Sequence, residues 1–194
     1  MNKNIENEKR LMLTLEQYEI LMKDFIQIQG SVIFDQVNYY FDDEDLSLRD
    51  HHIVLRIRSI NNNQYELTAK IKGDNGDTEL NYPLSKEEVD TFISNPTFDD
   101  NLLKETIENV TSKPVKLITS LETRRLECQK EDHLVVIDKN HYSDVTDYNL
   151  EIEASSIEDA SKYILYYTSK YHLTYDENYL SKSRRAINRA LNKK

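Results

Sequence analysis

The sequence predicts an α+β protein whose core is an antiparallel sheet of about eight strands. Three observations carry this prediction. Several segments alternate between charged and apolar side chains, which is the period of a strand with two different faces. Short polar turns join most of these segments directly, as in successive hairpins. Other segments have helical spacing and begin at serine or threonine, the residues that cap helix N-termini.

In the first half of the chain, strands dominate the predicted order. The first strand covers residues 5–13, and Thr14 with Gln17 forms a capping box that begins a helix. Alternation then predicts strands at residues 32–43, 53–60, 64–72 and 78–84. Polar turns at 61–63 and 73–77 make the last three of them successive hairpins.

In the second half, strands and helices are mixed. Ser85 and Glu88 cap a helix that runs to about residue 95, and residues 102–110 suggest another short one. Three strands are predicted at residues 115–127, 133–139 and 148–154. A helix over residues 157–173 and a basic segment over 176–194 complete the chain.

An even number of antiparallel strands suits a closed barrel. The helices would pack outside on the apolar faces, and the charged faces would point into the barrel. If the sheet stays open, the same charged faces point to solvent. The pattern therefore leaves a closed eight-stranded antiparallel β-barrel and an open sheet as alternatives, in either case in a single domain spanning residues 1–194.

Composition restricts the classes of function. The 194 residues include 35 acidic and 25 basic side chains, and this net charge of −10 argues against binding to nucleic acid or to anionic membranes. The single cysteine, Cys128, cannot form an internal disulfide and is expected to be a small buried strand residue. The first thirty residues hold no long apolar run, so we expect a cytoplasmic protein.

Charge is segregated between the predicted strands. One hairpin carries basic residues on a single face, namely Arg56, Arg58, Lys70 and Lys72. The first and last strands carry acidic ones, namely Glu6, Glu8, Glu151 and Glu153. An ordinary solvated face explains such residues as well, but it usually mixes charges more thoroughly. Basic groups beside clustered carboxylates would hold a polyanion and a hard cation together, as phosphoryl chemistry requires.

Six motifs in register resemble one known family. They are "ENE", "QVNYYFDD", "LRIR", "LTAKIK", "IDKNHYSDVTDYNLEIE" and "SKSRRA", and they extend from about Asn4 to Ala186. In this order they resemble the CYTH family of triphosphate tunnel metalloenzymes, and more narrowly its Gram-positive bacterial branch. The resemblance implies that the sheet is a closed eight-stranded antiparallel β-barrel, with helices packed on the outside, whose interior tunnel binds a triphosphate, and this is the fold that we predict. Members hydrolyse inorganic triphosphate, thiamine triphosphate or other triphosphates, and one branch cyclises ATP.

The resemblance also implies roles for individual residues. Five carboxylates would be catalytic and would bind magnesium or manganese: Glu6, Glu8, Asp138, Glu151 and Glu153. Eight basic residues would bind the substrate: Arg10, Arg56, Arg58, Lys70, Lys72, Arg125, Lys182 and Arg185. The alternation of the family's strand places Arg125, and not Arg124, on the interior face. The period of the strand alone does not choose between these two residues. Glu79 is a further candidate for the same interior.

Two positions depart from the family's pattern. The opening motif E-x-E-x-K has Arg10 in place of its lysine, and Asn149 stands where many relatives have another glutamate. Arginine and lysine are not interchangeable at a tight phosphate site, so Arg10 bears on substrate choice or rate. Asn149 in place of that glutamate would reduce the number of carboxylate ligands to the metal by one.

The predicted function is therefore metal-dependent hydrolysis of a triphosphate, either inorganic triphosphate or an organic one such as thiamine triphosphate. Two alternatives stay open. One is an adenylate cyclase, although no adenine pocket is recognisable, and the other is a non-catalytic module that binds polyphosphate or a nucleotide. The expected partner is a triphosphate-containing small molecule, and a homodimer remains an open alternative.

Overall fold

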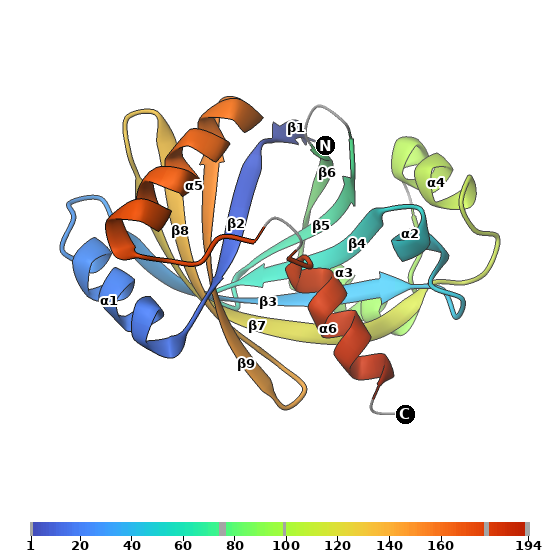
Figure 1. Ribbon diagram of the computed structural model, residues 1–194. Helices are drawn as coiled ribbons and strands as arrows, with labels where there is room; N and C mark the ends of the chain where they lie inside the picture. Colours follow the sequence, from blue (N-terminus) through green and yellow to red (C-terminus); the bar gives the residue numbers. More distant parts are fainter. Residues whose placement is uncertain (1, 74–76, 99, 177–178, 193–194) are drawn as a thin grey trace. The chain divides into compact units, whose positions relative to one another are not determined.

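The computed structural model describes residues 2–73, 77–98, 100–176 and 179–192, with side chains from residue 7 onward (Figure 1). The α+β class is confirmed. The strands are β1 (Asn2–Glu6), β2 (Glu8–Leu13), β3 (Val32–Asp42), β4 (Ile53–Ile60), β5 (Gln64–Ile71), β6 (Asp77–Leu84), β7 (Lys116–Gln129), β8 (His133–Tyr142) and β9 (Val145–Ala154). The helices are α1 (Leu15–Ile26), α2 (Ser47–Asp50), α3 (Lys86–Ser94), α4 (Asn101–Glu108), α5 (Ile157–Tyr171) and α6 (Lys182–Leu191). None of these helices is long and apolar enough to span a membrane.

The sheet is open, and the prediction of a closed eight-stranded barrel is wrong for the described residues. The strand order is β1-β6-β5-β4-β3-β7-β8-β9-β2, so β1 and β2 are the two ends of a nine-stranded sheet. They come from the single strand predicted at residues 5–13, which is interrupted at Asn7. The Asn7 carbonyl accepts from the backbone N–H of Ala154 at 3.1 Å. Alternation could not reveal an open sheet, because charged and apolar side chains alternate identically in open and closed ones.

The chain divides into two compact units, which we describe separately. Unit 1 comprises residues 1–5, 37–121 and 182–194, and unit 2 comprises residues 6–36 and 122–181. Both β3 and β7 contribute residues to each unit.

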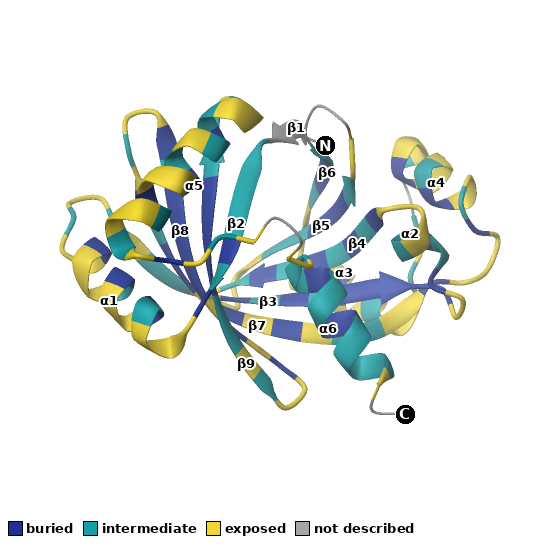
Figure 2. Ribbon diagram, in the orientation of Figure 1, coloured by how far each residue is buried: buried dark blue, intermediate teal, exposed yellow. Residues whose placement is uncertain are grey.

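The core of unit 2 lies on the apolar face of β2, β8 and β9. Leu11, Ile137, Leu150 and Ile152 are fully buried there, and Leu21 and Phe25 of α1 with Ile164 of α5 pack in the same cluster. The outer surfaces of both helices are exposed (Figure 2). Cys128 is buried in this core, as predicted. The capping box of Thr14 and Gln17 is also confirmed. Packing of one sheet face leaves the opposite face of these strands for polar side chains.

The core of unit 1 repeats this arrangement with other helices. Leu55 and Ile57 of β4 and Leu80 of β6 are buried in one cluster with Phe92 of α3 and Leu103 of α4. The predicted capping box at Ser85 begins α3. Here too, the alternate residues of the strands form a polar face.

The turn after β3 is organised by a buried carboxylate. Asp43 is fully buried and accepts a hydrogen bond from the backbone N–H of Ser47 at 2.9 Å, and it also accepts from the Thr111 hydroxyl. Burial alone would raise its pKa, but these hydrogen bonds lower the pKa of Asp43 to about 2. Because the folded pKa lies below the unfolded one, this carboxylate stabilises the protein above pH ~4, and the stabilisation is lost as pH falls toward 2.

We expect Asp43→Asn to lower the free energy of unfolding by on the order of 2 kcal/mol at pH 7. The difference from the wild type should narrow as pH falls from 5 to 3, since the wild-type carboxylate then loses its advantage. Urea denaturation of the wild type and the variant, at pH 7 and between pH 5 and 3, measures the two free energies of unfolding. Asp90→Asn, at an exposed position of α3, is the control and should change little. A difference that is constant with pH would show that the charge of Asp43 contributes nothing.

Candidate functional site

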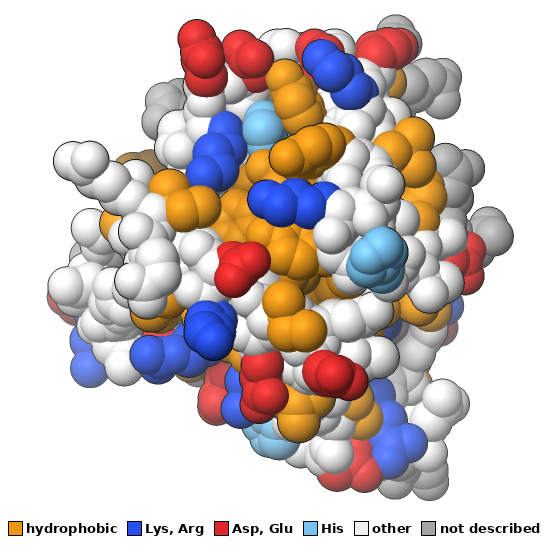
Figure 3. Space-filling model, turned by 60° about the vertical axis from the view of Figure 1, so that its left-hand side comes forward, with side chains coloured by type: hydrophobic (Ala, Val, Ile, Leu, Met, Phe, Trp, Pro, Cys, Tyr) orange, Lys and Arg blue, Asp and Glu red, His pale blue; other side chains and the backbone are white. Residues whose placement is uncertain are grey.

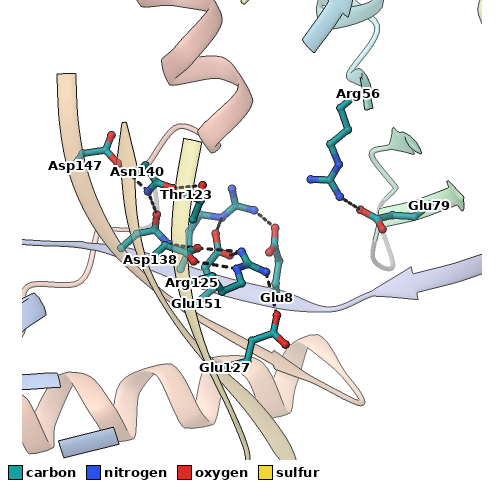
Figure 4. Close-up of polar contacts among 12 residues, drawn as sticks. Glu8, Arg56, Glu79, Thr123, Arg125, Glu127, Asp138, Asn140, Asp147 and Glu151 are labelled. Atoms are coloured by element: carbon teal, nitrogen blue, oxygen red, sulfur yellow. Dashed lines mark hydrogen bonds and ion pairs between the residues drawn. The ribbon is translucent and has the colours of Figure 1, made fainter. Parts of the chain in front are cut away.

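The register of β7, β8, β9 and β2 collects polar side chains on one face of unit 2. Arg10 lies opposite Glu151, Glu8 opposite Glu153, and Asp138 opposite both Asn149 and Arg125. We call this surface the unit 2 polar face, and its polar members are Glu8, Arg10, Thr123, Arg125, Glu127, Asp138, Asn140, Asp147, Asn149, Glu151 and Glu153. Figure 4 labels Glu8, Thr123, Arg125, Glu127, Asp138, Asn140, Asp147 and Glu151 among them.

A buried ion pair lies at the centre of this face. Arg125 binds Asp138 with two hydrogen bonds, from Nε to Oδ1 at 2.9 Å and from Nη2 to Oδ2 at 3.0 Å. Asp138 is completely buried and Arg125 is only 8% exposed. Burial alone would lower the pKa of Arg125, but Asp138 and then Glu151 raise it, so the guanidinium stays charged. This fork geometry fixes both groups in one orientation.

Glu151 lies between two guanidinium groups. Its Oε2 is 3.3 Å from Nη2 of Arg125, and its Oε1 is 3.9 Å from Nε of Arg10. Arg10 also forms an ion pair with Glu8 of the same strand. Glu8 in turn lies directly opposite Glu153 of β9, and like charges at such positions repel each other.

A network of amides supports the ion pair. Asn149 donates to Asp138 Oδ2 at 3.4 Å and accepts from Asn140 Nδ2 at 2.7 Å. Asn140 also donates to Asp147 at 3.0 Å and accepts from the Thr123 hydroxyl at 2.9 Å. Because Asn149 can donate as well as accept, it links two polar groups that a glutamate could not both satisfy.

Four residues of this face had not been predicted: Thr123, Glu127, Asn140 and Asp147. Each lies two residues from a polar residue on its strand, namely Arg125, Asp138 or Asn149. The period of a strand was therefore sufficient to find them.

The donors of this face fit a hard divalent cation. Six carboxylates share the face with only two guanidinium groups, and carboxylate oxygens are the preferred ligands of magnesium and manganese. In the part of the chain that the structure describes, no three His, Cys, Asp or Glu residues already form a metal-binding group. The side chain of Glu6, a predicted ligand, lies outside the described residues.

Unit 1 presents a second polar face, defined by the register of β4, β5 and β6. Its charged and polar members are Arg56, Arg58, Glu66, Thr68, Lys70, Asp77, Glu79 and Asn81. Charge is thus less segregated than the sequence predicted, because Arg56 Nη2 lies 3.4 Å from Glu79 and Lys70 lies 3.4 Å from Asp77.

Buried polar atoms on this face are not fully satisfied. Arg56 Nε and Asn81 Oδ1 have no hydrogen-bond partner among the described residues, and neither does Asn38 Oδ1 of the neighbouring β3. Such atoms are rare in folded proteins and indicate groups that bind water or a ligand. A phosphate oxygen is a suitable acceptor for Arg56.

Three predicted substrate residues lie elsewhere in unit 1. Lys72 follows the end of β5 and is exposed. Lys182 and Arg185 are half-buried in the first turns of α6.

Comparisons with known proteins agree on one family. The model of the CYTH domain matches residues 4–184. A Bacillus subtilis protein named "Putative triphosphatase YjbK" is 32% identical over 157 residues, which cover 80% of each chain. Two solved structures share the fold. A "putative adenylate cyclase" from Bacillus halodurans has a TM-score of 0.86 at 24% identity, covering 95% of this chain and 98% of that one. A "putative adenylyl cyclase" from Hippeastrum, described as having a dominant triphosphatase activity, has a TM-score of 0.79 at 16% identity, covering 95% and 96%.

Proposed function

This chain belongs to the CYTH family, and from that premise we propose that it hydrolyses a triphosphate with the help of a divalent cation. The family prediction is confirmed, including its Gram-positive branch, by the Bacillus subtilis relative. One observation carries the functional proposal: the register of the strands brings six carboxylates and two arginines together on the unit 2 polar face. A protein retains such a cluster at a cost in repulsion, which a bound cation would offset.

Each set of residues has a role in this reaction. Magnesium or manganese, when bound, would stabilise phosphate charge and lower the pKa of a coordinated water. Glu8 and Glu153 would hold the ion, with Glu6 as a third ligand. Asp138 and Glu151, which the family resemblance also makes metal ligands, both contact Arg125, which would hold the two carboxylates in position beside the ion.

Arg56, Arg58 and Lys70 would bind phosphate oxygens and neutralise the charge of the substrate. For Lys72, Lys182 and Arg185 we propose an auxiliary role in attracting the same anion. Side chains must supply this binding, because the chain has only three glycines and no glycine-rich phosphate loop.

The decisive experiment is incubation with tripolyphosphate, ATP or thiamine triphosphate, with magnesium or manganese, followed by separation of the products. Release of phosphate from tripolyphosphate that requires the metal supports the proposal. Conversion of ATP to a cyclic nucleotide would identify a cyclase instead. Binding of tripolyphosphate without turnover under any condition would identify a non-catalytic module.

Arg56→Ala is expected to weaken the binding of tripolyphosphate at least about tenfold, because a charge-assisted hydrogen bond to phosphate is lost. Calorimetric titration measures this affinity. Arg49→Ala is the matched control, since Arg49 is a partly exposed arginine of unit 1 that pairs with Asp50. Equal affinities in both variants would remove Arg56 from the substrate site.

Arg10→Lys is expected to keep or raise kcat/KM for tripolyphosphate, whereas Arg10→Ala should lower it about tenfold or more. Alanine would leave Glu8 and Glu151 without the cation that contacts both of them. Lysine keeps that charge and restores the family's residue. Identical kcat/KM values in the wild type and both variants would place residue 10 outside the site.

A further inference from the structure

A groove lies on the helical side of unit 2. It has a volume of about 630 Å³, and α1, α5 and the turn after β7 line it. The lining includes Lys23, Phe25, Lys130, Tyr166, Tyr167 and Lys170. The space-filling view brings the side of α1 and α5 forward and shows hydrophobic surface with Lys and Arg side chains beside and across it (Figure 3). These helices pack on the apolar face of the sheet, so the groove is not part of the unit 2 polar face.

Aromatic rings form much of the groove. Phe25 packs edge-on against Tyr167 with ring centroids 5.7 Å apart, and Tyr166 packs on Tyr167 at 5.0 Å. Phe25 is buried, whereas Tyr166 is 55% exposed. The exposed ring of Tyr166, supported by Tyr167, is therefore the surface on which a flat ligand could stack.

The charges at this groove are mostly positive. Three lysines line it together with a single carboxylate, Asp24, which accepts a hydrogen bond from the Tyr171 hydroxyl at 3.1 Å. Lys130 Nζ lies 5.3 Å from the Phe25 ring centroid, and Lys170 Nζ lies 5.1 Å from that of Tyr171. In a chain with a net charge of −10, this local excess of lysine favours an anionic ligand.

We propose that this groove binds a nucleoside monophosphate, with the base stacked on Tyr166 and the phosphate near the three lysines. The volume lies within the range of small-molecule pockets. Several ammonium groups match a ligand with a doubly charged phosphate better than they match a ligand with a single carboxylate. The aromatic rings supply the stacking surface that a bare inorganic anion would not use. This site is separate from the residues that we propose for hydrolysis.

The test is calorimetric titration of the full chain with AMP, without metal, at low salt. We expect saturable binding that both Lys170→Ala and Tyr166→Ala weaken about fivefold or more. Lys162→Ala is the matched control, because Lys162 also lies on α5 and over a tyrosine ring, but does not line the groove. It should bind AMP like the wild type.

Two further binding measurements distinguish this site from the proposed catalytic site. Arg56→Ala should leave AMP binding unchanged, and inorganic phosphate should bind at least about tenfold more weakly than AMP. Absence of AMP binding would overturn the proposal. It would also be overturned if AMP bound equally well to the Lys170 and Tyr166 variants, if Arg56→Ala abolished binding, or if phosphate bound as tightly as AMP.

Discussion

Replacement of Arg125 by alanine is expected to lower the free energy of unfolding by about 3–5 kcal/mol, because it removes one partner of a buried ion pair. Asp138 is completely buried, and Glu151 is 3% exposed. Both carboxylates contact the Arg125 guanidinium, at 2.9 and 3.3 Å. Without it, two charges would remain in an interior that solvates them poorly. Urea denaturation measures the loss, and phosphate release should fall with it.

Arg124→Ala is a matched control on the neighbouring residue of β7. The side chain of Arg124 is 55% exposed and pairs with Asp35, also exposed, at 3.3 Å. Surface pairs of this kind contribute about 0–1 kcal/mol, so this variant should unfold almost like the wild type. The double variant Arg125→Leu/Asp138→Asn should recover part of the stability, because it neutralises Asp138, one of the two carboxylates that the loss of Arg125 leaves behind. If Arg124→Ala and Arg125→Ala cost the same, the buried pair does not stabilise the fold.

The neighbouring residues Arg124 and Arg125 show what the sequence could predict and what it could not. The period of a strand places Arg124 and Arg125 on opposite faces but does not say which face is buried. The family resemblance selected Arg125, and the structure places it on the polar face with Asp138. The hairpins and the two capping boxes were predictable because they depend on neighbours in the chain.

Other features depend on distant partners and were not predictable. The interruption at Asn7 is held by Ala154, which lies far along the chain, and no local pattern marks it. Pairing of Asp138 with Asn149 follows from the register of β8 with β9, which alternation alone leaves undetermined. Helix α2 forms where Asp42 accepts from the backbone N–H groups of Leu48 and Arg49. Asp42 belongs to the strand predicted at residues 32–43, but no helix was predicted for the residues that follow it.

The double variant Glu8→Gln/Glu153→Gln is expected to lower kcat/KM for tripolyphosphate by roughly 100-fold or more, since a bound cation supplies several kcal/mol of transition-state stabilisation. The metal-free protein should unfold at the same or a higher temperature. Glu8 and Glu153 lie directly opposite each other on β2 and β9, so neutralising both removes a repulsion between strands. Glu151 is a poorer choice, because its removal would leave Arg10 and Arg125 without a shared partner.

A metal ligand has a further effect that a surface carboxylate lacks. Magnesium or manganese that binds only the folded protein raises its melting temperature, and the double variant should lose most of this increase. Glu122→Gln/Glu158→Gln is the control, because it removes the same charge from two exposed positions of unit 2. It should retain both the hydrolysis and the effect of the metal. If Glu8→Gln/Glu153→Gln hydrolyses tripolyphosphate at the wild-type rate with saturating metal, these two glutamates do not hold the cation. The carboxylate pair would then be a cost to stability that metal binding does not explain.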